Sequence, residues 1–264
     1  MKITVFTSNQ PRHIHLINKL STIAKTVYAV QECNTVFPGK VKDFFDNSPV
    51  MKDYFERVMQ SEKNIFGNID FVSSNVRTLS LKSGDLNNVS MDVLSEALKS
   101  DFYIVFGSSF IKGDLIEFLV NNRAINIHMG ISPYYRGSSC NFWAAYDGNI
   151  NFVGATIHML SKGLDSGQML YHALPKLDYL EAFDLGMSAV KSAHESLVER
   201  IKMDEIGKFV PVAQDKSLEI RYTRNKDFND EIALSYLRSL PCKEQVYDKL
   251  ANRDLSIFLE PYVG

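Results

Sequence analysis

The stretch DFYIVFGSSFIKGDLIEFLVNNRAINIH, residues 101–128, decides the fold of this 264-residue chain. Its continuous apolar run Phe102–Phe106 is typical of a strand buried on both faces of a parallel sheet, and Gly107 ends it. The amphipathic stretch Asp114–Asn121 predicts a helix, and Ala124–His128 predicts the next strand. A strand, a helix and a second strand in this order predict a right-handed parallel crossover, the unit of an open α/β layer fold.

The residues before this unit follow the same alternation. Ile3–Phe6 and Thr26–Val30 predict strands, and Pro11 suits the first turn of the helix between them, because its missing N–H costs nothing there. Weaker signals indicate a helix around Val50–Met59, a strand near Val76–Leu81, and a helix capped by Ser90 with Met91, Leu94 and Leu98 on one face.

The pattern changes after Gly148. Phe152–Leu160 and Gln168–Leu174 predict two extended segments, and a long helix follows with Phe183, Met187, Val190, Leu197 and Ile201 on one face. Beyond about Gly207 the chain becomes more polar and charged. We therefore expect an open, mostly parallel Rossmann-like sheet with helices on both faces over residues 1–206. Residues 207–264 would form a small C-terminal appendage for substrate binding or dimerisation.

Composition and charge argue against several classes of partner. A net charge of -2 gives no broad attraction to nucleic acid or to a membrane surface. No apolar run approaches the roughly 20 residues of a membrane span, and the strand-like opening is unlike a signal peptide. Cys33, Cys140 and Cys242 form no close pair, which suits a reducing compartment and offers no metal framework. We therefore expect a cytoplasmic protein that uses no metal.

Ligands of an open parallel sheet bind outside the carboxyl ends of its strands. This rule selects Thr7–His13, Phe106–Lys112, Asn126–Gly137 and the loop 161–167. Because side chains two apart on a strand share a face, the third segment presents an amide and an imidazole together. The loop 161–167 adds a carboxylate that two flanking glycines hold in a tight turn.

These three side chains, Asn126, His128 and Asp165, suit carbonyl chemistry. An amide, an imidazole and a carboxylate can bind a carbonyl, stabilise its oxyanion and move a proton. No serine or cysteine nucleophile is needed if the substrate brings its own amine. An Asn-x-His pair also occurs where the histidine is structural, and spacing alone does not show that Asp165 reaches His128.

With these residues the chain resembles the formyltransferases, which include glycinamide ribonucleotide transformylase and methionyl-tRNA formyltransferase. The motif runs Asn-Ile-His at 126–128, Pro-x-Tyr-Arg-Gly at 133–137, Gly-x-Thr-x-His at 154–158 and Gly-Leu-Asp-x-Gly at 163–167. The match covers about Phe102 to Leu174, and the compound motif is far more specific than any of its parts.

The resemblance implies a role for each catalytic candidate. Asn126 would hydrogen-bond the formyl oxygen, His128 would stabilise the charge of the tetrahedral intermediate, and Asp165 would tune His128 and relay the amine proton. The formyl donor of the family is 10-formyltetrahydrofolate, and no metal is used. The residues expected at the pterin are Ser109, Phe110, Ile111, Lys112, Leu160, Gly163 and Leu164, although Phe110 and Ile111 would look the same as ordinary core residues.

The acceptor side departs from the best-known members. The first strand is followed by Thr7–His13 without the glycine-rich loop that holds the phosphate in the purine enzymes. The part after Gly207 is short and acidic for a tRNA-binding domain. The chain is more similar to sugar N-formyltransferases, which act on nucleotide-linked amino-dideoxysugars such as GDP-perosamine or dTDP-4-amino-4,6-dideoxyglucose for O-antigen and lipopolysaccharide synthesis. The residues expected to contact such an acceptor are Asn9, Gln10, Arg12, His13, Tyr135, Arg136, Gly137, Trp143, Tyr222 and Arg224.

Several alternatives stay open. Within the class, methionyl-tRNA formylation or formyltetrahydrofolate hydrolysis fits the same motif, and a noncatalytic folate- or nucleotide-binding module fits the same fold. A Rossmann dehydrogenase is disfavoured because the first turn has no Gly-x-Gly-x-x-Gly. A homodimer is possible through the apolar C-terminal residues Ile257, Phe258, Leu259 and Tyr262.

Overall fold

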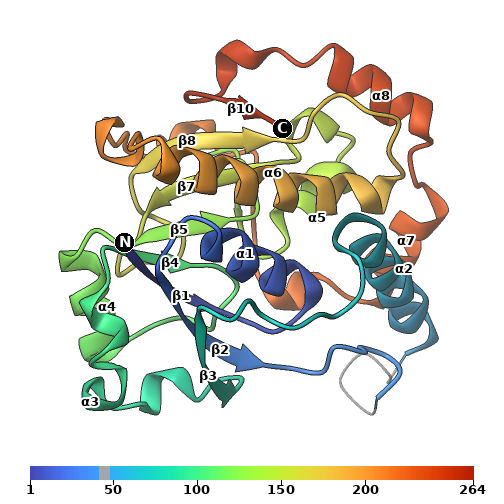
Figure 1. Cartoon of the computed structure of the whole chain (residues 1–264). Helices are drawn as coiled ribbons and strands as arrows, with labels where there is room; N and C mark the ends of the chain where they lie inside the picture. The colour runs from blue at the N-terminus through green and yellow to red at the C-terminus, as the bar shows by residue number, and fades with distance from the viewer. Residues whose placement is uncertain (42–47) are drawn as a thin grey trace.

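The computed structural model describes residues 1–41 and 48–264 and has one central sheet (Figure 1). Within these residues the sheet has eight strands in the order β10-β8-β7-β5-β4-β1-β2-β3. Their bounds are β1 Lys2–Thr7, β2 Thr26–Cys33, β3 Val76–Lys82, β4 Phe102–Val105, β5 Ile125–His128, β7 Ala155–Met159, β8 Met169–Leu174 and β10 Tyr262–Val263. The strands from β3 to β5 pair in parallel, whereas β7 pairs antiparallel with both β5 and β8. The predicted open, mostly parallel α/β sheet is confirmed.

Helices cover both faces of the sheet, as predicted. On one face, α1 (Pro11–Ser21) and α6 (Ala182–Lys202) pack on Ile3, Val5 and Ile127, and Figure 1 shows both helices crossing in front of the strands. On the other face, α4 (Gly113–Asn121) packs against Phe6, Tyr103 and Val105. The alternation of β1, with Ile3 and Val5 facing one core and Phe6 the other, is the period of an extended strand buried on both sides.

The expected helix after Ser90 is shorter than predicted. The α-helix α3 covers only Met91–Leu94, a 3₁₀ turn follows at Ala97–Lys99, and the side chain of Ser90 caps neither. The backbone N–H of Asp101 donates to the carbonyl of Lys2, so the chain must already leave the helical path there to enter β4. Tertiary pairing with β1 therefore overrides the local helical pattern.

The remaining helices gather at the carboxyl side of the sheet. They are α2 (Pro49–Phe66), α5 (Cys140–Tyr146), α7 (Asp230–Arg238) and α8 (Lys243–Ala251). Two strand pairings are among the contacts that join the residues after 206 to the rest of the chain. The short strand β9 (Arg221–Thr223) pairs with β6 (Tyr135–Gly137), and β10 extends the main sheet beside β8. Phe258, named above as a candidate for a dimer contact, is 5% exposed and packs on Ile131 and Leu174.

Candidate active site

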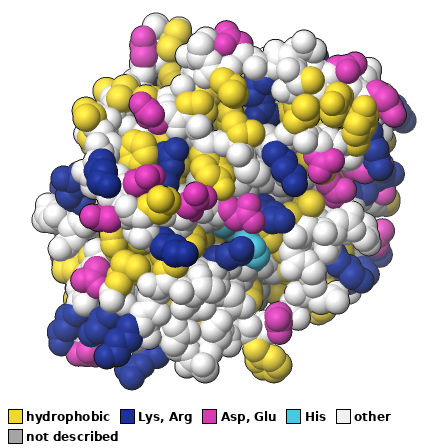
Figure 2. All heavy atoms as spheres, turned by 45° about the horizontal axis from the view of Figure 1, so that its top comes forward, with side chains coloured by type: hydrophobic (Ala, Val, Ile, Leu, Met, Phe, Trp, Pro, Cys, Tyr) yellow, Lys and Arg dark blue, Asp and Glu magenta, His cyan; other side chains and the backbone are white. Residues whose placement is uncertain are grey.

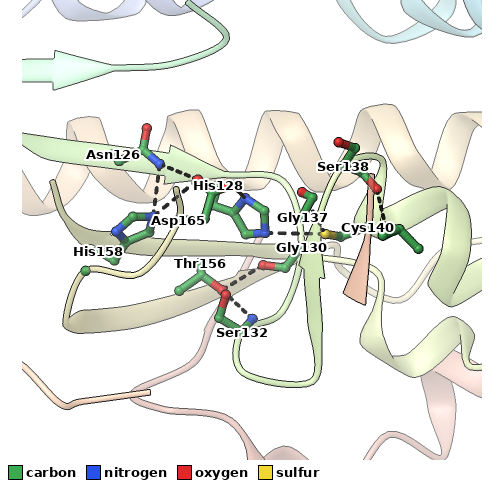
Figure 3. Close-up of polar contacts among 12 residues, drawn as sticks. Asn126, His128, Gly130, Ser132, Gly137, Ser138, Cys140, Thr156, His158 and Asp165 are labelled. Carbon is green, nitrogen blue, oxygen red and sulfur yellow. Dashed lines mark hydrogen bonds and ion pairs between the residues drawn. The ribbon is translucent and has the colours of Figure 1, made fainter. Parts of the chain in front are cut away.

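The carboxyl end of β5 brings the three catalytic candidates together (Figure 3). Asn126 and His128 lie two apart on β5, and Asp165 lies on the loop between β7 and β8. Nδ1 of His128 is 3.3 Å from Oδ2 of Asp165, and Nδ2 of Asn126 donates to Oδ1 of Asp165 at 3.1 Å. The contact between His128 and Asp165, which spacing alone left open, is therefore present.

The His128–Asp165 pair is electrostatically coupled. Burial opposes charge on His128, but the Asp165 carboxylate and the neighbouring Cys140 sulfur outweigh it and hold the pKa of His128 well above its ordinary value. Burial also opposes charge on Asp165, yet His128 and then the other contacts keep the pKa of Asp165 below its ordinary value. Both shifts favour the charged form of the pair, an imidazolium facing a carboxylate.

His158 is a site residue that the sequence analysis quoted without assigning a role. It lies directly opposite Asn126 in the antiparallel pairing of β5 with β7. Burial lowers the pKa of His158 to about 4, so the ring is neutral. Its Nδ1–H donates to the carbonyl of Met159 at 2.8 Å, which leaves Nε2 to accept from Nδ2 of Asn126 at 2.9 Å. Both amide hydrogens of Asn126 are thus used, one on His158 and one on Asp165.

The other ring nitrogen of His128 faces Cys140. Its Nε2 is 3.5 Å from Sγ of Cys140, and that thiol donates to the carbonyl of Gly137 at 3.3 Å. Cys140 is the first residue of α5 and is buried. The imidazole of His128 is therefore held at both nitrogens, by a carboxylate on one side and a thiol on the other.

A cavity of about 280 Å³ opens beside these residues, and we call it the triad cavity. Asn126, His128 and Asp165 line it together with six of the seven residues expected at the pterin: Ser109, Phe110, Ile111, Leu160, Gly163 and Leu164. Lys112, the seventh, does not line it. The side chain of Lys112 is exposed, and its backbone N–H donates to Oδ1 of Asn87.

Glu32 on β2 fixes the segment that lines the triad cavity. Its carboxylate accepts from the backbone N–H of Ser109 at 2.6 Å and from the hydroxyl of Ser109 at 2.9 Å. It also accepts from the backbone N–H groups of Gly84 and Leu86. Burial works against its charge, but these donors lower the pKa of Glu32. No local sequence pattern marks Glu32 as a site residue, because its partners lie about fifty and about eighty residues away along the chain.

A second cavity of about 320 Å³ lies between α2, α5, α6 and α7, and we call it the aromatic cavity. Its rings are Tyr54, Phe142, Phe183 and Tyr236. Met129, the residue after His128, lines both cavities.

Of the ten residues expected to contact the acceptor, Arg12 lines the aromatic cavity. Nη1 of Arg12 donates to Oε1 of Glu62 at 2.8 Å, so its charge is already paired. His13 is instead 3% exposed and bonded through Nδ1 to the hydroxyl of Thr7 at 2.7 Å. Burial, then the nearby Arg12 charge, lowers the pKa of His13 well below its ordinary value. His13 is therefore a buried, neutral residue that joins Thr7 to α1, and it lines neither cavity.

Two further candidates have packing roles. Tyr135 is buried, its hydroxyl donates to Asp147 at 3.2 Å, and it accepts from Nδ2 of Asn149 at 2.7 Å. Trp143 is 3% exposed and lies under the guanidinium of Arg221, whose carbon is 4.7 Å from the ring centre. Neither residue lines either cavity, whereas Phe142, the neighbour of Trp143, lines the aromatic cavity.

The remaining acceptor candidates also lie elsewhere. Nη1 of Arg136 donates to Glu219 at 2.9 Å, so that its charge joins β6 to the C-terminal segment. Gly137 has a φ of 88°, and a side chain there would meet the carbonyl oxygen of Thr223 at 1.9 Å, so the residue serves the close pairing of β6 with β9. Four more candidates line neither cavity: Asn9, Gln10, Tyr222 and Arg224. The last two are exposed.

Other kinds of site find little support. Over residues 1–41 and 48–264, no group of three or more His, Cys, Asp or Glu side chains is arranged to hold a metal ion. In the same residues no helix has the length and apolarity needed to cross a membrane. On the face that Figure 2 shows, acidic and basic side chains are interspersed, in keeping with a net charge of -2.

Comparison with solved structures supports the fold. A 4-N formyltransferase from Francisella tularensis superposes with a TM-score of 0.53 at 18% identity, over 90% of this chain and 87% of that one. An N-formyltransferase from Helicobacter canadensis, in complex with folinic acid and dTDP-3-aminofucose, gives a TM-score of 0.50 at 11% identity, over 93% of this chain and 80% of that one.

Comparison with curated proteins adds the family. A methionyl-tRNA formyltransferase from Anaeromyxobacter sp. (strain K) is 32% identical over 122 residues, which are 45% of this chain and 38% of the relative. One from Synechococcus sp. (strain JA-3-3Ab) is 29% identical over 123 residues, again 38% of the relative, so the match spans well under half of these proteins. The model of the formyl transferase family matches residues 1–201, and the chain therefore belongs to that family.

Proposed function

We propose that this protein is an N-formyltransferase that moves a formyl group from 10-formyltetrahydrofolate to the amine of a nucleotide-linked amino-dideoxysugar. The observation that carries the proposal is the meeting of Asn126, His128 and Asp165 at the wall of the triad cavity, next to a second cavity. We place the reaction in the cytoplasm, in the supply of sugars for O-antigen and lipopolysaccharide assembly.

The triad cavity suits the pterin ring of the donor. Its walls combine apolar side chains such as Ile111, Ile116 and Leu160 with the backbone of the 107–111 and 160–165 segments. A flat ring rich in donors and acceptors needs such a combination of apolar faces and backbone partners. The Helicobacter canadensis relative, which holds folinic acid, supports the same class of donor.

The charge on His128 suits the transition state. When the amine attacks, the formyl oxygen gains negative charge, and the Nε2–H of the imidazolium is the donor not engaged with Asp165. A prearranged donor of this kind in a buried site contributes about 3–4 kcal/mol to lowering the barrier. In this structure Nε2 of His128 contacts Sγ of Cys140. To reach the oxyanion, the Nε2–H group must either turn away from Cys140 or share its hydrogen between the sulfur and the oxyanion.

Asp165 and Asn126 complete the transfer. A new bond forms between the amine nitrogen and the formyl carbon, the bond from N10 of the folate to that carbon breaks, and the amine proton moves to N10 through Asp165. The amide hydrogens of Asn126 are both engaged, so the formyl oxygen can receive one only in exchange for His158 or Asp165. Binding of the donor would thereby loosen Asp165 at the moment that it is needed as a base.

A mass-spectrometric transfer assay tests the proposal. Purified protein is given 10-formyltetrahydrofolate with a panel of GDP-, dTDP- and UDP-linked 3- or 4-amino sugars. Gain of one formyl group on an amino-dideoxysugar is the expected result. Folate consumption without any formyl gain would indicate a hydrolase, and formylation of methionyl-tRNA alone would place the chain with the curated relatives.

A further inference from the structure

We propose that the aromatic cavity binds the sugar ring of the acceptor and selects a 6-deoxy sugar, while the diphosphate and nucleoside stay outside it. This inference rests on the proposed function and adds the place and the chemical class of the group that carries the amine.

Two features place the aromatic cavity next to the catalytic residues. Met129 follows His128 along the chain and lines both cavities. In addition, Cys140 contacts His128, and its two neighbours Ser139 and Asn141 both line the aromatic cavity. A ring seated there would hold its amine on the His128 side of Met129, facing a formyl group in the triad cavity.

The walls of the cavity come from four helices. Tyr54 of α2 lies 5.9 Å from Phe142 of α5 and 5.3 Å from Phe183 of α6, measured between ring centres. Tyr236 of α7 lies 5.0 Å from Phe142 and 5.9 Å from Phe183. The rings meet edge to face, the arrangement that aromatic side chains favour, and they give the cavity apolar walls.

The walls are also electrically neutral. Burial raises the pKa of Tyr54, and it raises the pKa of Tyr236 to about 12, so both phenols stay uncharged. Arg12 is the one charged residue among the described residues that line the cavity, and Glu62, which is 5% exposed, already pairs with it.

This neutrality decides which part of the acceptor enters. A diphosphate would have to leave water without an unpaired cation to receive it, and burying unpaired charge is strongly unfavourable. An uncharged sugar ring can instead lay its C–H faces on the aromatic walls. A methyl group at C6 suits such walls, whereas a hydroxymethyl group would bury a hydroxyl against them.

Gly186 of α6 offers a direct test of the site. It lines the aromatic cavity, and a Cβ atom added there would meet no other atom within 4 Å. Gly186→Leu therefore adds a side chain at the lining of the cavity with no clash at Cβ, and it replaces glycine in a helix with a residue of higher helix propensity. Gly207→Leu is the matched control, since Gly207 has equally open surroundings and lines neither cavity.

The experiment measures kcat/KM for formylation of dTDP-4-amino-4,6-dideoxyglucose and of its counterpart with a hydroxyl at C6. We expect the wild type to prefer the 6-deoxy sugar by about 10- to 100-fold, the range that apolar pockets achieve against an added hydroxyl. Gly186→Leu should lower kcat/KM for the sugar at least tenfold while folate binding and thermal unfolding stay unchanged. Gly207→Leu should leave kcat/KM, folate binding and thermal unfolding all unchanged.

Unchanged kinetics in Gly186→Leu, or equal use of both sugars by the wild type, would overturn the inference while leaving the proposed function intact. Absence of sugar formylation by the wild type would instead overturn the proposed function, and this inference with it.

Discussion

Sγ of Cys140 lies 3.5 Å from Nε2 of His128, the ring nitrogen opposite the one that Asp165 holds. The imidazolium is thus oriented by two residues of different chemistry. The carboxylate is a strong partner that keeps the ring charged, and the thiol is a weak acceptor that a developing oxyanion can displace. In the proposed reaction, Cys140 acts as a positioning residue for His128.

Removing this sulfur should weaken catalysis and shift its pH range. In Cys140→Ala the sulfur that helps to raise the pKa of His128 is gone, so the alkaline limb of kcat/KM should move to lower pH. We expect a loss of about fivefold in kcat, the worth of a net hydrogen bond of about 1 kcal/mol. Cys33→Ala, at a cysteine outside both cavities, is the control. An alkaline limb that stays in place would show that the sulfur only fills space.

The His128–Asp165 pair predicts in which direction the pKa of His128 moves when the carboxylate is removed. The folded-state pKa of His128 is raised, so the charged ring persists above the ordinary range of histidine and is lost only as pH rises through the higher value. In Asp165→Asn the attraction disappears, and the charge on His128 should be lost at lower pH. A titration of the His128 ring by NMR in both proteins measures this, and an equal or higher pKa in Asp165→Asn would contradict it.

His158 should be needed for the orientation of Asn126. His158→Ala leaves one amide hydrogen of Asn126 without its partner, so we expect kcat to fall about tenfold, near the lower end of what lost site geometry costs. His172 is the matched control, because it is equally buried, its pKa is likewise lowered to about 4 by burial, and it bonds to the carbonyl of Ser132 away from the triad. His172→Ala should lower the thermal stability as much as His158→Ala does, but it should leave kcat unchanged. Equal kcat loss in both variants would mean that His158 is only a core residue.

Glu32 and Glu62 should act on different substrates. Glu32→Gln weakens the bonds that hold Ser109, so KM for the folate donor should rise about tenfold with little change in kcat. Glu62→Gln instead frees the charge of Arg12 at the aromatic cavity and should alter KM for the sugar alone. Steady-state kinetics with each substrate varied in turn separates the two effects. A change of both KM values in either variant would contradict the assignment of one cavity to each substrate.

Features that depend on residues close together along the chain could be predicted from the sequence, whereas features that depend on residues far apart along the chain could not. Asn126 and His128 share a face because of the strand period, and Asp165 lies on a glycine-flanked loop, so each could be singled out locally, but only the family motif joined them into one site. His158 could not be assigned, because its role depends on β7 pairing antiparallel with β5, and no local pattern gives the direction of that pairing. The histidine of the Gly-x-Thr-x-His motif was the only available signal.

The aromatic cavity could not be predicted for the same reason. It is built by α2, α5, α6 and α7, which are distant in sequence, and their aromatic residues look individually like core positions. Residues such as His13 and Trp143 were expected at the acceptor instead, because they are prominent polar or aromatic residues. Their burial depends on tertiary partners, Phe106 for the first and Arg221 for the second.

The most direct test of the proposed reaction compares wild type with His128→Gln in a single-turnover transfer assay. Both proteins are loaded with 10-formyltetrahydrofolate, given the amino sugar that the wild type accepts, and sampled by mass spectrometry. We expect the wild type to move one formyl group to the sugar, and His128→Gln to bind the folate equally well but to transfer at least 100 times more slowly, as expected for loss of an oxyanion donor. Transfer by His128→Gln at the wild-type rate would contradict the central role assigned to this residue.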